Sequence, residues 1–227
     1  MEAIAHIHTD LPTKFGVPRQ SGLVEALKGR IIFTPKYREP EALRGLEDFS
    51  HIWLIWEFSL ARCEEWSPTV RPPRLGGNKR LGVFATRSPF RPNSLGLSCV
   101  RLERVELHGP EGPELHVSGV DLMNGTPIFD IKPYAPYADC HPEATGGFTT
   151  RLADVVLQVD FPEKWRRFFT PEQQTALVGI LERDPRPHYH RDPVRVYGMP
   201  FAGYDVHFRV QDGVAEVLDV VRLEKHG

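Results

Sequence analysis

The sequence predicts a mainly β protein, in which a β barrel or a strongly curved sheet is followed by a small α+β domain. Short apolar segments recur along the first 160 residues and are separated by turns rich in Gly and Pro. Before residue 160, hardly any segment has the length and periodicity of a helix. A Rossmann domain would need alternating helices and a Gly-rich turn, and the sequence offers neither.

The first domain is expected to span residues 1–145. Its strand candidates are short apolar runs or segments that alternate with the two-residue period of a strand. One or two helical turns are expected at residues 39–46, and the turn at residues 109–112 predicts a hairpin. The predicted strands are residues 3–8, 29–35, 50–59, 81–86, 95–107 and 114–121.

The second domain, residues 151–227, follows a linker at residues 140–150 and differs in character. Residues 154–161 alternate as a strand. Thr170 begins the pattern of a capping box with proline in the first helical position, which predicts the start of a helix. The domain is expected to close with a meander of three strands at residues 197–201, 204–210 and 214–223.

The composition is that of a globular protein close to neutral charge. The chain has 227 residues, of which 41% are hydrophobic, and a net charge of −2. Its three cysteines have no C-x-x-C spacing, which supports neither a zinc ribbon nor a disulfide framework and favours a reducing, cytoplasmic setting. We expect no signal peptide and no membrane span, since the longest apolar block, residues 52–56, is too short to cross a bilayer. His6 and His8 lack a third ligand nearby, so no metal site is predicted.

Residues 71–96 are the most distinctive part of the sequence, because they are basic and conformationally restricted at once. This segment contains six Arg or Lys side chains and no Asp or Glu. Its Pro and Gly residues break any helix and force turns, so the cations would sit on defined backbone. A segment whose charged residues are all basic, in a protein that is nearly neutral as a whole, indicates a local binding site for an anion. A solvated basic loop would have the same composition.

Residues 121–139 form a second unusual stretch. Asn124-Gly125 predicts a tight turn. After it, Asp130, Lys132 and Tyr134 alternate, so they would project to one side of an extended segment. A carboxylate, an amine and a phenol together can make a proton-transfer site, and an exposed strand face with a surface ion pair explains the pattern equally well.

Residues 183–195 interleave four arginines with histidine, tyrosine and acidic side chains in a loop fixed by prolines. This composition suits a phosphodiester backbone with an unstacked base, and it also suits an ordinary surface loop. The sequence lacks the G-x-x-x-x-G-K-[ST] phosphate loop and the G-x-S-x-G nucleophile motif. The residues alone therefore indicate an arginine-lined site for a nucleic acid or another anionic ligand, and they name no reaction.

A resemblance to a known family is carried by longer strings, which are FGVPRQSGL (15–23), RGLEDFSHIWLIWEF (44–58), RPPRLGG (71–77), RLGVFATRSPFRPNSLGLS (80–98) and DLMNGTPIFDIKPYAPYAD (121–139). These strings resemble the TsaA-like family and, within it, the bacterial TrmO group of tRNA methyltransferases. DPRPHYHR (184–191) and VHFRV (206–210) are similar to that group as well. The resemblance thus covers nearly the whole chain.

This resemblance implies a homodimeric β-barrel methyltransferase that is unrelated to the Rossmann type and binds S-adenosylmethionine near the subunit interface. The implied reaction is N6-methylation of N6-threonylcarbamoyladenosine at position 37 of threonine tRNA. The implied RNA partner is the anticodon stem-loop, which the C-terminal domain could contact, and neither DNA nor a membrane is expected as a partner. Two other functions stay open, namely an S-adenosylmethionine-binding regulatory module without catalysis and a methyltransferase for another substrate.

The resemblance also assigns roles to individual positions. The methyl donor would be bound by Pro18, Arg19, Gln20, Ser59, Leu60, Arg87, Leu97, Asp121, Leu122, Met123 and Asn124, the last standing where the family often has Asp. Asp130 or Tyr134 is the candidate general base, with Lys132 expected to lower the pKa of the phenol. The tRNA contacts would be made by Lys79, Arg80, Arg91, Arg186, Tyr189 and Arg191.

Overall fold

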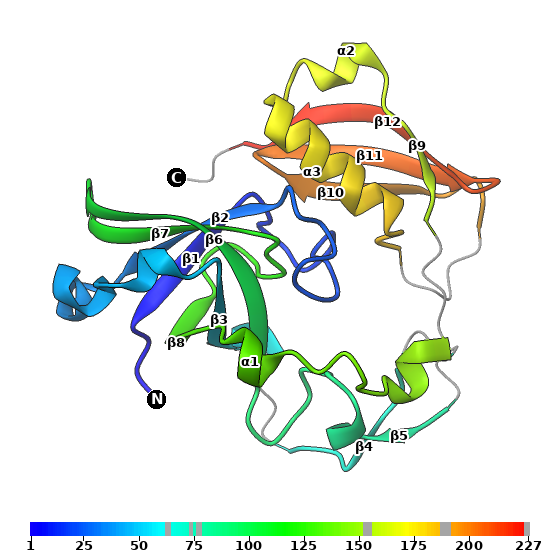
Figure 1. Cartoon of the computed structure of the whole chain (residues 1–227). Helices are drawn as coiled ribbons and strands as arrows, with labels where there is room; N and C mark the ends of the chain where they lie inside the picture. The colour runs from blue at the N-terminus through cyan, green and yellow to red at the C-terminus, as the bar shows by residue number, and fades with distance from the viewer. Residues whose placement is uncertain (62–64, 73–74, 76–78, 152–155, 187–191, 225–227) are drawn as a thin grey trace.

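The structure is a computed structural model and describes residues 1–61, 65–72, 75, 79–151, 156–186 and 192–224 (Figure 1). It contains a closed barrel in the first part of the chain and a four-stranded sheet in the last part. The mainly β fold class that the sequence predicts is therefore confirmed. Within the described ranges, every helix is too short or too polar to cross a membrane.

Six strands close into an antiparallel barrel in the order β1-β2-β7-β6-β3-β8. Closure pairs both edges of every strand, so the barrel presents no long free edge to another chain. Five of them start within two residues of a predicted strand, and the sixth, β8, lies in the stretch where residues 130–134 are expected to alternate. The six strands are β1 (Ala5–Thr9), β2 (Lys28–Phe33), β3 (His51–Glu57), β6 (Leu95–Gly109), β7 (Gly112–Ser118) and β8 (Pro127–Pro133).

Alternation along the strands fills the barrel with apolar side chains. In β3, Ile52, Leu54 and Trp56 are buried, while the residues between them are partly exposed on the outer surface. The same period places Ile7 of β1 and Ile128 of β8 in the core. Burial of these side chains stabilises the barrel and leaves its outer surface and its ends for function.

The chain between β3 and β6 contains a two-stranded hairpin, β4 (Thr69–Val70) and β5 (Leu81–Gly82), followed by a short 3-10 helix, η6 (Val83–Ala85). The predicted strand at residues 81–86 is therefore wrong beyond Gly82. Val83 is buried, and its carbonyl accepts hydrogen bonds from Thr86 Oγ1 at 2.9 Å and Arg91 Nη1 at 3.2 Å. These local bonds close a turn, so the chain does not continue extended.

Several helical elements are only three to five residues long. The one or two helical turns predicted at residues 39–46 are found as one 3-10 helix, η2, and η3 begins only at the end of that range. The others are too short to show a helical period, and the sequence analysis did not predict them. The short elements are η1 (Pro35–Tyr37), η2 (Pro40–Leu43), η3 (Leu46–Asp48), η4 (Ser59–Ala61), α1 (Pro136–Asp139), η7 (Gly147–Arg151) and α2 (Glu163–Arg166).

The C-terminal sheet has the order β10-β11-β12-β9, and helix α3 (Pro171–Glu182) crosses it (Figure 1). α3 starts where predicted, because Thr170 Oγ1 accepts the Gln173 N–H at 3.3 Å and the Gln173 side chain accepts the Thr170 N–H at 3.1 Å. Only β9 runs parallel to its neighbour, β12. The strands are β9 (Gln158–Asp160), β10 (Val196–Phe201), β11 (Tyr204–Gln211) and β12 (Val214–Arg222).

The loop at residues 10–20 packs against the C-terminal sheet domain. The Gln173 side chain of α3 donates a hydrogen bond to Asp10 Oδ2 at 3.1 Å. Gly16 has a φ of 95°, and a Cβ atom there would overlap the Met199 sulfur. Gly16 is thus required both by its backbone conformation and by the close approach of β10.

Candidate functional site

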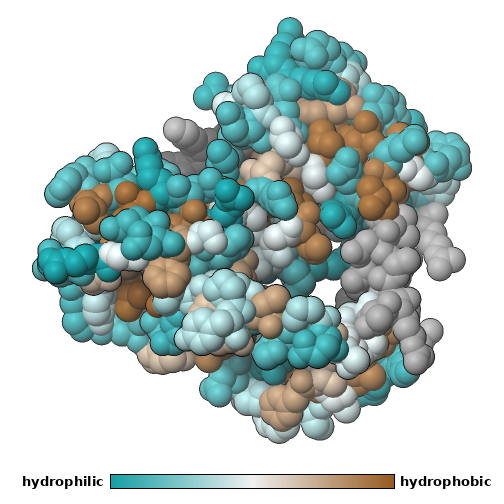
Figure 2. Space-filling view, in the orientation of Figure 1, coloured by the Kyte–Doolittle hydropathy of each residue, from teal (hydrophilic) through white to brown (hydrophobic). Residues whose placement is uncertain are grey.

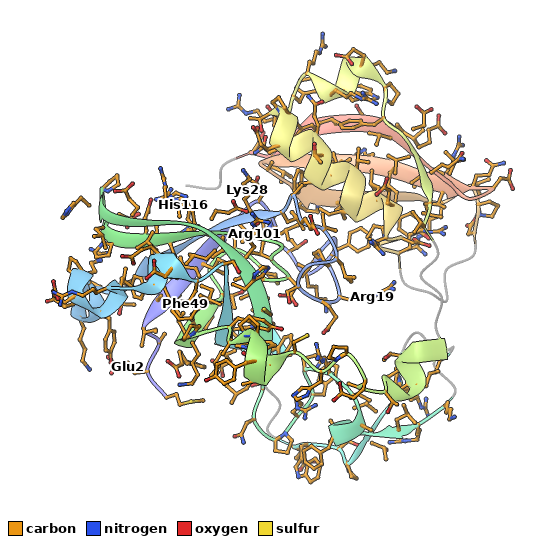
Figure 3. All side chains as sticks on the ribbon, viewed as in Figure 1. Glu2, Arg19, Lys28, Phe49, Arg101 and His116 are labelled. Carbon is orange, nitrogen blue, oxygen red and sulfur yellow. The ribbon has the colours of Figure 1, made fainter. Side chains whose placement is uncertain are left out.

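A cavity of about 1030 Å³ lies where β3 ends and β6 begins. Its wall combines strand ends with loops that are far apart in the sequence, and Figure 3 shows Arg19 on one of these loops. The lining residues lie within segments 12–20, 56–61, 86–91 and 95–97 and at positions 121, 123 and 126.

One part of the wall is a connected polar group of Arg19, Gln20 and Arg87. The Arg87 guanidinium donates to the Gln20 side-chain oxygen, and the Gln20 amide donates to the main-chain carbonyl of Arg19. Arg19 Nη2 in turn donates to the main-chain carbonyl of Asp184 at 3.4 Å. Two guanidinium groups held in place by hydrogen bonds make this wall suited to an anion such as a carboxylate.

A second part of the wall is the Asp121 carboxyl group, which a hydrogen-bonded chain orients. Ser98 Oγ donates to Asp121 Oδ1 at 2.6 Å and accepts the Trp56 Nε1–H at 2.9 Å. Burial raises the pKa of Asp121 to about 6, opposed by hydrogen bonds from Ser98 and backbone N–H groups and by the charge of Arg87. Near neutral pH, the cavity therefore contains a carboxylate that protonates more readily than an exposed one.

The inner end of the cavity is aromatic, and Gly96 makes room for it. Gly96 and Trp56 are directly opposite each other on β6 and β3. A Cβ atom on Gly96 would overlap the Trp56 indole. The indole also packs against Phe58, with ring centroids 4.2 Å apart. The cavity thus offers flat apolar surface next to its charged groups.

Most positions that the resemblance assigns to the methyl donor line this cavity. Leu122 does not, because it is buried in the core. Asn124 is also absent from the wall, since its side-chain oxygen accepts the Thr9 N–H at 3.1 Å. It lies in the predicted tight turn, where Gly125 has a φ of 79°. The donor positions on the wall are Pro18, Arg19, Gln20, Ser59, Leu60, Arg87, Leu97, Asp121 and Met123, and donor binding by any of them stays a prediction.

Two candidate catalytic residues, Asp130 and Lys132, lie outside the wall of the cavity. They project from the same side of β8, as predicted, and form an ion pair with a 3.1 Å Nζ–Oδ2 distance. Asp130 is opposite Ile55, which is opposite the cavity residue Leu97. Because strands are about 4.8 Å apart, the Asp130 and Leu97 backbones are separated by about 10 Å. Asp130 therefore lies beside the cavity and does not reach into it in this structure.

The third candidate, Tyr134, packs on the outer surface of the barrel. Its ring lies 6.1 Å from that of His51 and 5.9 Å from that of Trp53. Burial raises the pKa of the Tyr134 phenol, and interactions with the thiols of Cys140 and Cys99 act in the same direction. The expectation that Lys132 lowers this pKa is therefore wrong.

The predicted tRNA contacts fall into two groups. Arg91 lines the cavity, and the exposed Lys79 and Arg80 precede β5 in the neighbouring hairpin. Arg186 instead donates to both carboxylate oxygens of Asp184, at 2.8 and 2.9 Å, so contact with a phosphate would have to compete with this pair. Tyr189 and Arg191 lie outside the described residues.

Sequence reasoning missed several wall residues. Glu57 adds a second carboxylate to the wall, and Lys14 adds a further cation. The only signal for Glu57 was that it ends the apolar block of β3, which is also what an ordinary solvent-facing strand end looks like. Trp56 and Phe58 lie in the predicted strand 50–59, and only the three-dimensional position of the strand end shows that a cavity borders them.

We expect Asp121→Asn to remove a dependence of stability on pH. The carboxyl pKa is about 6 in the folded protein and roughly 3.9 when unfolded. Between these values the folded state binds more protons, so the free energy of unfolding falls as the pH rises. The contribution of Asp121 is present below pH ~4 and lost as the pH rises through ~6, a change of roughly 3 kcal/mol at most. Urea unfolding of both proteins across this range measures it.

Asp139→Asn is the control, because the pKa of Asp139 is shifted in the opposite direction to that of Asp121. The Ala135 N–H and the Trp53 indole lower the pKa of Asp139 in the folded protein. The wild type should therefore gain stability relative to this variant as the pH rises. If the difference between Asp121→Asn and the wild type is the same at every pH, the buried-carboxyl interpretation is incorrect.

Gly96→Ala should destabilise the protein by about 1–3 kcal/mol, because the added methyl group displaces the Trp56 indole. Chemical unfolding measures the loss, and near-ultraviolet circular dichroism should change as the indole moves. Gly82→Ala is the matched control, since a Cβ atom at Gly82 meets no atom within 4 Å. Equal stability of the two variants would argue against the close Trp56–Gly96 contact.

Comparisons with known proteins agree with this architecture. Residues 6–140 match the model of the tRNA-methyltransferase O N-terminal domain, and residues 154–223 match that of the TrmO C-terminal domain. The tRNA (adenine(37)-N6)-methyltransferase of Escherichia coli K12 is 39% identical over 224 residues, with 95% of each chain covered. A protein of the same name from Eikenella corrodens is 44% identical over 177 residues, which cover 78% of this chain and 99% of that one.

A solved structure is similar over its whole length. The crystal structure of TrmO from Pseudomonas aeruginosa superposes with a TM-score of 0.76 at 34% sequence identity, covering 97% of this chain and 96% of that one. Both domain models and full-length relatives therefore lead to the same conclusion. The chain belongs to the tRNA-methyltransferase O family.

Proposed function

We propose that this protein is an S-adenosylmethionine-dependent tRNA methyltransferase that methylates N6 of adenine 37, and that its substrate is the N6-threonylcarbamoyl form of that adenosine in threonine tRNA. The observation that carries the proposal is the cavity of about 1030 Å³, whose wall combines arginines, a buried carboxyl group and aromatic rings. Family membership and the names of the full-length relatives support the reaction class.

The chemistry of the wall fits S-adenosylmethionine, which supplies a methyl group on a positively charged sulfur. The Arg19 and Arg87 guanidinium groups are suited to the carboxylate of such a molecule. Asp121 and Glu57 are suited to its cationic groups and ribose hydroxyls. Phe58, which packs on the buried Trp56 beside these groups, gives apolar surface for the adenine ring.

The main catalytic task in this proposal is alignment of the accepting nitrogen with the methyl group for in-line displacement. An acyl substituent withdraws electrons from N6 and makes its proton more acidic, so a nearby base would add to the rate. Asp130 and Tyr134, the bases suggested by the sequence, lie outside the cavity wall. Asp121 is on it and, with a pKa of about 6, is mostly ionised near neutral pH, so we propose it as the proton acceptor to test first.

The tRNA would approach over the basic segment 71–96 that borders the cavity. Arg91 is on the wall, and Lys79 and Arg80 extend the cationic surface to the hairpin. Contacts to phosphates release counterions, so binding should weaken steeply as salt increases. A homodimer and a cytoplasmic location are parts of the same proposal, and sedimentation of the purified protein tests the first of these.

The decisive assay uses labelled S-adenosylmethionine with two forms of threonine tRNA, one carrying the threonylcarbamoyl group and one lacking it. We expect methyl transfer to the modified form alone. Transfer to neither form, with donor binding intact, would instead favour a donor-binding module without catalysis. Transfer to both would retain the enzyme and remove the requirement for the threonylcarbamoyl group.

Arg87→Met should weaken donor binding roughly tenfold or more, because it removes one charge-assisted contact and the support of Gln20. Titration calorimetry with the methyl donor measures the change. Arg101→Met is the matched control, since Arg101 pairs with Glu103 on the outside of the barrel (Figure 3). Similar affinities of the two variants would place the anionic group of the donor elsewhere.

A further inference from the structure

We propose that Trp66 and Phe84 form a platform on which the protein stacks an unpaired RNA base adjoining the base to be methylated. This inference rests on the proposed function and adds to it a surface that recognises single-stranded RNA. Neither ring was among the residues that the sequence assigned to tRNA, and neither lines the cavity.

The local fold presents Phe84 to solvent. The preceding residue, Val83, is buried, and its N–H donates to the Pro68 carbonyl at 2.9 Å across the hairpin. The η6 turn therefore anchors the chain through Val83 and directs the next side chain outward. As a result, 71% of Phe84 is exposed.

Trp66 extends this surface from the other side of the hairpin. The two ring centroids are 6.0 Å apart, with an angle of 30° between the ring planes. Half of Trp66 is exposed, so both rings keep surface that another ring can contact. At the lower edge of the molecule, where Figure 1 places hairpin β4–β5, Figure 2 shows tan patches among teal and white surface. Aromatic rings clustered in solvent usually mark a binding surface.

Arg91 connects the platform to the cavity. Its guanidinium carbon lies 5.6 Å from the centroid of Phe84, and Arg91 also lines the cavity. Hydrogen bonds from Nη1 to the carbonyls of Thr86, at 2.7 Å, and Val83, at 3.2 Å, hold it in place. Arg91 alone therefore separates the platform from the cavity. A nucleotide next to the reacting base could reach the platform while that base occupies the cavity.

The charges around the platform favour RNA as the occupant. Segment 71–96, which carries Phe84, contains six Arg or Lys residues and no acidic residue, whereas Glu64 and Glu65 precede Trp66 in the sequence. On the same hairpin, Arg80 Nε donates to Thr69 Oγ1 at 2.8 Å, which holds one cation in place. Exposed rings interleaved with cations are how proteins hold single-stranded nucleic acid, because bases stack while phosphates are neutralised.

The test measures binding of a fluorescent anticodon stem-loop RNA by anisotropy, without turnover. Phe84→Leu should weaken binding roughly tenfold, since stacking of one base contributes on that scale. Phe84→Tyr, which keeps the ring, should bind like the wild type. Phe49→Leu removes an exposed ring on the opposite side of the barrel and should have no effect (Figure 3). Donor affinity should be the same in all four proteins.

A second arm replaces each nucleotide beside the target adenosine by an abasic one. At one of the two positions beside the target adenosine, removing the base should weaken RNA binding by the wild type. The same abasic RNA should bind Phe84→Leu as well as the complete RNA does. Equal effects of the abasic RNA on both proteins would overturn the platform. So would a change of oligomeric state in Phe84→Leu, which would make the surface an interface between copies of this chain.

These results are separable from those of the methylation assay. If the wild type binds the RNA through Phe84 and transfers no methyl group, the platform holds and the enzymatic proposal fails. If the wild type methylates tRNA and Phe84→Leu binds it equally well, the platform alone is wrong.

Discussion

Packing of the Trp56 indole over Gly96 is the contact on which the cavity depends. The indole lies at the end of the barrel because the residue opposite it has no side chain. From that position its N–H reaches Ser98, and the Ser98 hydroxyl reaches Asp121. One steric requirement in the barrel thus sets the shape of the cavity and the direction of its buried carboxyl group.

The C-terminal domain supports the cavity from behind one of its loops. Among the described residues, those on the wall come from the first 126 residues of the chain. The loop that carries Arg19, however, is held on the C-terminal side by Gln173, by the close approach of Met199 to Gly16, and by the Asp184 carbonyl. The position of an arginine suited to the donor carboxylate therefore depends on a domain that follows it by more than a hundred residues.

The sequence predicts the regular parts of this fold well, since alternation identified the barrel strands and the capping box identified the start of α3. The strand predicted at residues 81–86 is wrong at residues 83–86. There, hydrogen bonds to the Val83 carbonyl close a turn and outweigh the strand propensity of the segment. For the site, alternation grouped Asp130 with Lys132 but could not reveal which surface their side faces. Arg19 and Arg87 came from resemblance, and Glu57 was missed because a cavity between distant loops leaves no local pattern.

The basic segment 71–96 has a consequence for the approach of a polyanion. Because the whole chain has a net charge of −2, the rest of the chain carries an excess of negative charge. The basic segment therefore attracts RNA more strongly than the average surface of the protein does. The electric field of the protein would therefore orient an approaching RNA toward the basic segment before the two molecules touch. Fewer collisions would occur at the wrong face of the protein.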